Sequence, residues 1–208
     1  NYMAHSDEAE KYSAAAFATK HEDAIYFSKR VTRAVPDGGP IEAHTDLVKK
    51  LDYECELAVV LGRDAKDVPA GQTRDYIFGY TILNDVSARD VQTAHKQWYF
   101  GKSLDGFTPI GPCIVTADAF ADYPPRLGIR SFVNGEKRQD SNTALQIFDI
   151  DHVIAELSQG MTLKAGTLIA TGTPAGVGMG MDPPQFLKPG DVVRCEIDGI
   201  GTLTNPVK

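Results

Sequence analysis

The stretch that decides the fold is Leu51-Asp52-Tyr53-Glu54-Cys55-Glu56-Leu57-Ala58-Val59-Val60-Leu61. Its second half is an almost unbroken apolar run, which indicates a β-strand buried on both faces. Side chains two residues apart on a strand point to the same face, so Glu54 and Glu56 should project side by side. Buried carboxylates need a partner, and the run contains no lysine or arginine.

A third acid, Asp85, ends a second strand-like run over residues 76–83. Acids that alternate along a strand often mark a solvated face, and spacing alone does not choose between that interpretation and a metal site. The apolar surroundings favour the metal site, because three clustered carboxylates repel one another unless a hard cation neutralises them. We therefore predict that Glu54, Glu56 and Asp85 hold Mg²⁺ or Mn²⁺, with Ca²⁺ as a further option.

The composition is that of a soluble globular protein, with 42% hydrophobic and 24% charged residues. The length predicts one domain over residues 1–208. A net charge of −7 without a basic stripe argues against a nucleic-acid partner. No apolar run reaches the ~18 residues that cross a bilayer. Cys55, Cys113 and Cys195 have no zinc spacing, and we expect reduced, buried thiols in a cytoplasmic protein. Because the chain starts at Asn1, a short preceding segment is expected.

The remaining pattern predicts a mainly β, α+β protein with a few short helices. Helices are expected over Ser6–Phe17 with Ser6 as the N-cap, over Ser87–Trp98, and over Asp151–Gln159. Short apolar runs separated by turns predict strands near residues 111–116, 129–133, 167–170 and 192–197, with a hairpin turn at Asn134-Gly135. Residues 17–50 look loop-rich. We find no internal repeat and no interior domain boundary.

Three common catalytic or nucleotide-binding motifs are excluded. Gly101-Lys102-Ser103 looks like the end of a phosphate-binding P-loop, but Lys96 stands where that motif needs glycine. The glycines of residues 176–180 lack dinucleotide-loop spacing, and no βαβ unit follows them. A Gly-x-Ser-x-Gly nucleophile elbow is absent from the sequence.

Several sequence blocks, in order along nearly the whole chain, resemble those of one known family. They lie at residues 1–8, 51–60, 79–92, 101–107, 109–112, 133–136 and 171–178. The chain resembles the fumarylacetoacetate hydrolase superfamily, in its shorter bacterial and mitochondrial branch. The resemblance implies a mixed β-sandwich roll, usually assembled as a homodimer.

The resemblance also implies residue roles. Glu54, Glu56 and Asp85 match the metal ligands of the family. A His-x-x-Glu pair on a short mobile helix, which handles protons or activates water, is matched by His5 and Glu8. Lys102 matches a catalytic position, where its charge would stabilise an oxyanion. Substrate-contacting positions are matched by Arg89, Gln92 and Thr173.

The expected function is metal-dependent hydrolysis of a C–C bond in acylpyruvate-like 2-oxo or enol dicarboxylic acids, with His5 and Glu8 activating water. Two alternatives remain open. One is an isomerase of 2-hydroxyhepta-2,4-diene-1,7-dioate, or an oxaloacetate tautomerase or decarboxylase. The other is a non-catalytic protein that binds a 2-oxo acid. Residues 17–50 are expected to shape the end of the pocket that selects the substrate.

Overall fold

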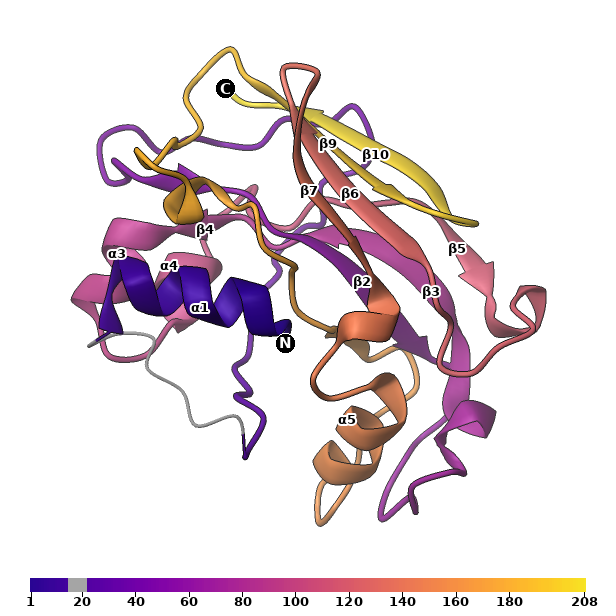
Figure 1. The fold of residues 1–208 in the computed structure, drawn as a ribbon. Coiled ribbons are helices and arrows are strands. Elements are labelled where there is room, and N and C mark those ends of the chain that lie inside the picture. Colours follow the sequence, from indigo (N-terminus) through magenta and orange to yellow (C-terminus); the bar gives the residue numbers. More distant parts are fainter. Residues whose placement is uncertain (15–21) are drawn as a thin grey trace.

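The computed structural model describes residues 1–14 and 22–208 (Figure 1). Its strands are β1 (Leu51–Asp52), β2 (Cys55–Leu61), β3 (Ile77–Asn84), β4 (Ser87–Ala88), β5 (Ile110–Thr116), β6 (Gly128–Val133), β7 (Glu136–Asn142), β8 (Leu168–Ala170), β9 (Val192–Ile197) and β10 (Gly201–Pro206). Its α-helices are α1 (Met3–Tyr12), α3 (Arg89–Ala94), α4 (Tyr99–Lys102) and α5 (Ile150–Leu157). Single 3₁₀ turns are η1 (Thr73–Tyr76), η2 (Ala117–Ala119), η3 (Thr143–Leu145) and η4 (Gly178–Gly180).

Two four-stranded antiparallel sheets form the centre of the molecule. One has the order β5-β3-β2-β8 and the other β10-β9-β6-β7, while β1 and β4 form a small separate pair. Strands β2 and β3 of the first sheet contact β6 and β9 of the second. The predicted class, mainly strand with a few short helices, is confirmed. The predicted turn at Asn134-Gly135 is also confirmed: it joins β6 to β7, with φ of 53° and 85°.

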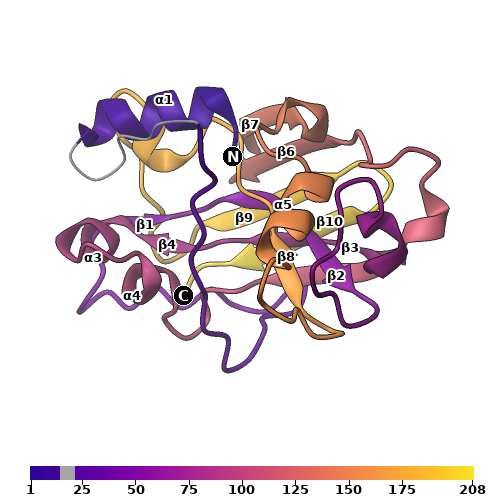
Figure 2. The same ribbon diagram turned by 90° about the horizontal axis from the view of Figure 1, so that it is seen from below.

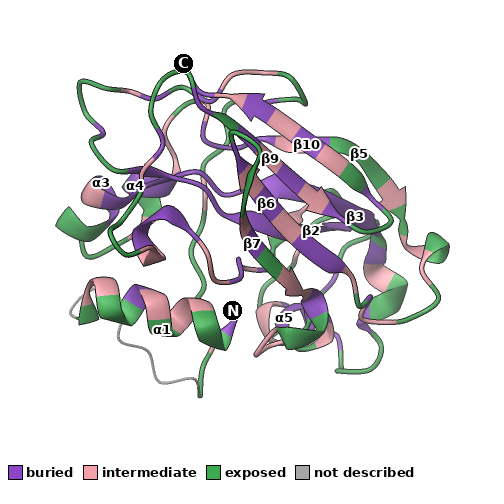
Figure 3. Ribbon diagram, turned by 45° about the horizontal axis from the view of Figure 1, so that its top comes forward, coloured by how far each residue is buried: buried purple, intermediate pink, exposed green. Residues whose placement is uncertain are grey.

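All seven residues of β2 are buried, as its apolar run predicts. One face of the strand carries Cys55, Leu57, Val59 and Leu61 into the core between the sheets. The opposite face carries the carboxylate of Glu56 toward the pocket described below. Figure 3 shows buried residues concentrated along β2, β3, β6 and β9. The core therefore holds one side of β2 rigid while its other side serves the pocket.

The first predicted helix begins earlier than the capping pattern indicates. Helix α1 starts at Met3, and Ser6 lies inside it, where its N–H donates to the carbonyl of Tyr2. The reason is that Tyr2 is buried and bridged to Gln146, which fixes the chain immediately before the helix. The helix also ends earlier than predicted, at Tyr12, because Ser13 is extended with φ of −160° and ψ of 92°. Phe17, the predicted end, lies outside the described residues.

The predicted helix over Ser87–Trp98 is wrong in extent. Ser87 and Ala88 instead form β4, which pairs with β1, and the helix that follows is only α3. The Ser87 hydroxyl donates to the carbonyl of Asp85 rather than capping a helix. For α5 the prediction is one residue late, since Asp149 caps its N-terminus.

Two further sequence-based expectations can be compared with the structure. Cys55 and Cys195 are buried free thiols as predicted, but Cys113 on β5 is exposed. Strand β5 lies at the edge of its sheet, and its middle residues Pro112, Cys113 and Ile114 are exposed. None of the helices in the described ranges is long and apolar enough to span a membrane.

Candidate functional site

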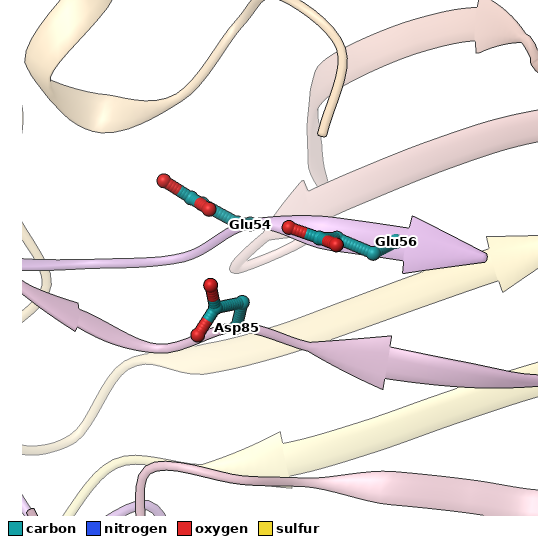
Figure 4. A group of neighbouring side chains, drawn as sticks. All are labelled: Glu54, Glu56 and Asp85. Atoms are coloured by element: carbon teal, nitrogen blue, oxygen red, sulfur yellow. The ribbon is translucent and has the colours of Figure 1, made fainter. Parts of the chain in front are cut away.

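The acidic residues that the sequence singles out lie together in the structure. Cys55 pairs with Asn84 across β2 and β3, which places Glu54 and Asp85 opposite each other where the two strands leave the sheet. The N–H of Asp85 donates to the carbonyl of Glu54 at 2.8 Å. One carboxylate oxygen from each of Glu54, Glu56 and Asp85 lies within 4.8 Å of the others, and all three residues are buried. Figure 4 shows the three side chains on these neighbouring strand segments.

Basic side chains from outside the strand neutralise two of these carboxylates. Lys102 Nζ lies 2.8 Å from Glu54 Oε2 and 2.7 Å from Asp85 Oδ2. Arg89 Nη1 lies 2.7 Å from Glu54 Oε1, and Lys29 Nζ lies 2.6 Å from Asp85 Oδ1. The strand run holds no base, so these partners come from loops and helices that sequence spacing does not connect to it.

The third carboxylate, Glu56, forms no salt bridge with any described lysine or arginine side chain. It accepts one hydrogen bond, from the N–H of Gly172 at 2.6 Å. Burial and the negative charges of Asp85 and Glu54 raise the pKa of Glu56 to about 8. Burial also opposes ionisation of Glu54, but Lys102 and Arg89 outweigh it and hold the pKa of Glu54 well below its usual range. The cluster therefore carries one poorly compensated acid.

This donor set fits a hard divalent cation. Three buried carboxylate oxygens within reach of one point are the ligands that Mg²⁺ and Mn²⁺ prefer, and they leave further coordination positions open. The under-compensated charge of Glu56 is what such a cation would neutralise. Mg²⁺, Mn²⁺ and Ca²⁺ all take oxygen ligands of this kind.

The acidic cluster opens onto a pocket of about 630 Å³. Its acidic end also receives His5, Gln92 and Thr173. From there the pocket follows β2 toward β8, which pairs with residues Ala58–Val60. Figure 2 shows α5 and β8 close together, on the side of the molecule away from α3 and α4. The pocket is therefore long, with the three acids at one end.

The far end of the pocket is apolar. Its lining residues there are Val153, Leu157, Leu163, Leu168 and Ile169. The segment 23–31 lines the pocket too: the hydroxyl of Tyr26 donates to Glu156 on α5, while Lys29 contacts Asp85 at the acidic end. This agrees with the expectation that residues 17–50 shape the pocket only for the segment 23–31, since residues 32–50 do not line it. Residues 17–21 lie outside the described residues. All lysine and arginine side chains among the described lining residues contact the acidic cluster instead.

His5 and Glu8 lie one turn apart on α1, beside the acidic end. His5 Nδ1 is 3.8 Å from Glu8 Oε2, beyond hydrogen-bond distance, and it has no hydrogen-bond partner among the described residues. The carboxylate of Glu8 accepts instead from the N–H of Gly176. His5 thus lines the pocket with its Nδ1 buried on the side of Glu8, while the carboxylate of Glu8 is held by the N–H of Gly176.

Arg89 is fully buried and largely committed to protein partners. Its Nε donates to Asp52 Oδ2 at 2.9 Å and its Nη1 donates to Gln92 Oε1 at 3.2 Å, in addition to the contact with Glu54. Its Nη2 is buried and has no hydrogen-bond partner among the described residues. Asp52 also accepts from the N–H groups of Gly178 and Met179. A buried acid thus links Arg89 to the turn against which α1 packs.

Sequence reasoning missed Lys29, Asp52 and Gln139, a buried residue of β7 that contacts Thr173. Lys29 comes from a loop-rich segment with no pattern that predicts its contact with Asp85. Asp52 could have been found from the sequence, because an acid inside a buried run requires a hydrogen-bonding or charged partner. No sequence pattern pointed to Gln139, since alternation along β7 does not show which residues its buried side chain contacts.

Comparisons with known proteins identify the family of the chain. The family model described as fumarylacetoacetate (FAA) hydrolase C-terminal matches residues 1–208. Oxaloacetate tautomerase YisK of Bacillus subtilis is 45% identical over 186 residues, which cover 89% of this chain and 62% of that protein. This chain therefore spans about three fifths of the length of that curated relative.

Two solved structures are also similar. A fumarylacetoacetate hydrolase from Exiguobacterium antarcticum has a TM-score of 0.89 and 47% identity, with 100% of this chain and 72% of that chain covered. A 2-hydroxyhepta-2,4-diene-1,7-dioate isomerase from Mycobacterium marinum has a TM-score of 0.79 and 44% identity, with 89% and 69% covered. The chain belongs to the fumarylacetoacetate hydrolase family.

Proposed function

We propose that this chain is a divalent-metal-dependent enzyme that interconverts the keto and enol forms of a 2-oxo acid. The observation that carries the proposal is the buried group Glu54, Glu56 and Asp85 at the end of a pocket that His5 also lines. A Mg²⁺ or Mn²⁺ ion held by these three residues would supply Lewis-acid polarisation of the substrate keto group. The sequence similarity to an oxaloacetate tautomerase and to a dienedioate isomerase supports the same chemistry.

The residues of the chain have distinct tasks in this proposal. Arg89 Nη2, buried and without a protein partner, would donate to the substrate carboxylate. His5, which lines the pocket beside the acids, would take the proton from the carbon next to the keto group and return it in the reverse direction. Lys102 would stabilise negative charge that develops on the keto oxygen. The proton leaves carbon and reaches oxygen, so no oxidant, reductant or water is consumed.

Hydrolysis of a C–C bond is the second candidate, and the proximity of Glu8 to His5 favours it. The 3.8 Å separation needs only a small rotation to give a hydrogen bond that would orient His5 toward a water molecule. Catalytic hydrogen bonds often tighten only when substrate binds. We rank tautomerisation first because it needs one proton-transferring group, whereas hydrolysis needs the pair and a positioned water.

The pocket also bears on substrate size. The expected dicarboxylic substrates place a second negative charge somewhere along the pocket, yet its described basic side chains all lie at the acidic end. Burying an unpaired carboxylate against the apolar wall of α5 and β8 would be costly. We propose that the substrate is either a short dicarboxylate that stays at the acidic end or a longer 2-oxo acid with an apolar tail.

The test is to incubate the purified protein with Mn²⁺ and either oxaloacetate or acetylpyruvate. Enol absorbance in the ultraviolet follows tautomerisation, and NMR identifies the products. The proposal expects EDTA-sensitive acceleration of the keto–enol exchange without new products. Pyruvate plus acetate from acetylpyruvate would establish hydrolysis instead, and pyruvate plus CO₂ from oxaloacetate would establish decarboxylation. His5→Gln should lose the activity while Glu10→Gln, an exposed residue on the same helix, should keep it.

A further inference from the structure

The strand that carries Glu54 and Glu56 loses its sheet neighbour at the level of these two acids. Strand β8 pairs with β2 only from Ala58 to Val60. Beyond this pairing, Thr171 continues the hydrogen bonding in part: both its N–H and its hydroxyl donate to the carbonyl of Leu57. The chain then turns away at Gly172, where φ is +92°. The backbone of Cys55 is therefore left without a strand partner on this side.

Two side chains replace the missing strand. The hydroxyl of Thr173 donates to the carbonyl of Cys55 at 2.9 Å. The side-chain oxygen of Gln139 accepts from the N–H of Cys55 at 3.1 Å, although Gln139 belongs to β7 of the other sheet. The amide nitrogen of Gln139 donates to Thr173 Oγ1 and to the carbonyl of Pro174, both at 2.7 Å. Both residues are at most 1% exposed.

Both amide hydrogens of the Gln139 side chain are used in hydrogen bonds to the protein. The two N–H groups donate to Thr173 and Pro174, and the side-chain oxygen accepts from the N–H of Cys55, which lies between the two acids. Thr173 likewise uses its one O–H on Cys55, so its hydroxyl cannot donate to a substrate at the same time. The substrate contact that the family resemblance implies for Thr173, which lines the pocket, would therefore involve an atom other than its hydroxyl hydrogen.

We infer that Gln139 and Thr173 are positioning residues that clamp the Cys55 peptide and thereby set the spacing of Glu54 and Glu56. Cys55 lies between the two acids, so fixing both its N–H and its carbonyl fixes the direction in which each neighbouring carboxylate leaves the strand. The same turn donates the Gly172 N–H to Glu56. Partners that orient ligands in this way are worth about 10- to 100-fold in metal affinity. This inference rests on the proposed metal role of the three acids.

The test measures Mn²⁺ affinity by calorimetric titration of the metal-free full chain. Thr173→Val, which keeps the shape but removes the hydroxyl, and Gln139→Met, which keeps the length but removes the amide, should each weaken Mn²⁺ binding about 10-fold or more. Thr173→Ser restores the hydroxyl and should bind Mn²⁺ within about 3-fold of wild type. Asn205→Met is the matched control, because Asn205 is also a buried amide that donates two hydrogen bonds, to Pro36 and Gly39, far from the acids.

A second measurement does not depend on metal. Hydrogen exchange of the Cys55 amide in the metal-free protein should accelerate in Gln139→Met, and not in Asn205→Met. Wild-type Mn²⁺ affinity in both folded variants, or unchanged Cys55 protection in Gln139→Met, would overturn the clamp. Failure of the wild-type chain to bind Mn²⁺ would instead overturn the proposed function, and with it the proposed effect of the clamp on metal affinity. The hydrogen-exchange measurement would then still test whether Gln139 holds the Cys55 peptide.

Discussion

Replacing Glu56 by glutamine should stabilise the metal-free protein, although it removes a proposed metal ligand. Glu56 is buried beside Glu54 and Asp85 and forms no salt bridge with a described lysine or arginine side chain, and its pKa is raised from 4.5 to about 8. A glutamine keeps an oxygen for the Gly172 N–H and can donate its amide hydrogens to the two neighbouring carboxylates. The substitution therefore removes a destabilising charge without leaving a polar atom unpaired.

The magnitude follows from the pKa. A raised carboxyl pKa means that the folded state holds its proton up to higher pH than the unfolded chain does. The resulting destabilisation is absent below pH 4.5, grows as the pH rises, and is complete above about pH 8. One pKa unit corresponds to about 1.4 kcal/mol, so the penalty at pH 7 is about 3 kcal/mol. We expect Glu56→Gln to recover about 2 kcal/mol of it, or roughly 4–8 °C in melting temperature.

The assay is urea denaturation of wild type and Glu56→Gln at pH 5, 7 and 9, with EDTA present throughout. The difference in unfolding free energy should be small at pH 5 and largest at pH 9. Glu196→Gln is the control, because Glu196 is only half-buried and pairs with Arg194. Its effect should not grow with pH. An equal difference between wild type and Glu56→Gln at all three pH values would refute the reasoning.

Three other changes have defined outcomes. Asp52→Asn should destabilise the protein by about 3 kcal/mol in urea denaturation, because it breaks the buried pair with Arg89, whereas Asp198→Asn, at the largely exposed pair with Arg130, should cost less than about 1 kcal/mol. Mn²⁺ at a concentration of 100 Kd should raise the unfolding free energy of wild type by about 2.7 kcal/mol, and that of Glu56→Gln by much less. Leu157→Glu should raise the KM for a 2-oxo acid with an apolar tail about 10-fold or more in steady-state assays while leaving oxaloacetate unaffected; the exposed Leu145→Glu serves as its control.

The sequence was a good guide where one local pattern decides the outcome. The apolar run after Glu56 predicts a strand buried on both faces, and the structure shows all of β2 buried. The i, i+2 spacing of Glu54 and Glu56 predicts that their carboxylates share a face, and they do. Asp85 joins them because it ends the strand that pairs with β2. These features follow from strand geometry and need no knowledge of distant contacts.

The parts that could not be predicted depend on contacts between segments far apart in the chain. Lys29 reaches Asp85 across 56 residues, and Gln139 reaches Cys55 across 84. The Ser87 segment has a good helix-start signal, yet pairing with β1 makes it a strand, because tertiary hydrogen bonds outweigh the modest free energy of a cap. Side-chain contacts of this kind leave no periodic trace, so a single sequence cannot reveal them.

The charge balance of the acidic end explains how the chain can fold without metal while the three acids still favour binding of a cation. Lys102, Lys29 and Arg89 compensate Glu54 and Asp85, so the metal-free chain does not bury three free carboxylates. No lysine or arginine of the described residues forms a salt bridge with Glu56. The Gly172 N–H and the clamp formed by Gln139 and Thr173 hold Glu56 in place despite its repulsion by Glu54 and Asp85. Full compensation would give a more stable protein with no net attraction for a cation. Leaving Glu56 without a basic partner destabilises the fold by a few kcal/mol, and a bound cation would replace the proton that the raised pKa of Glu56 retains in the metal-free protein.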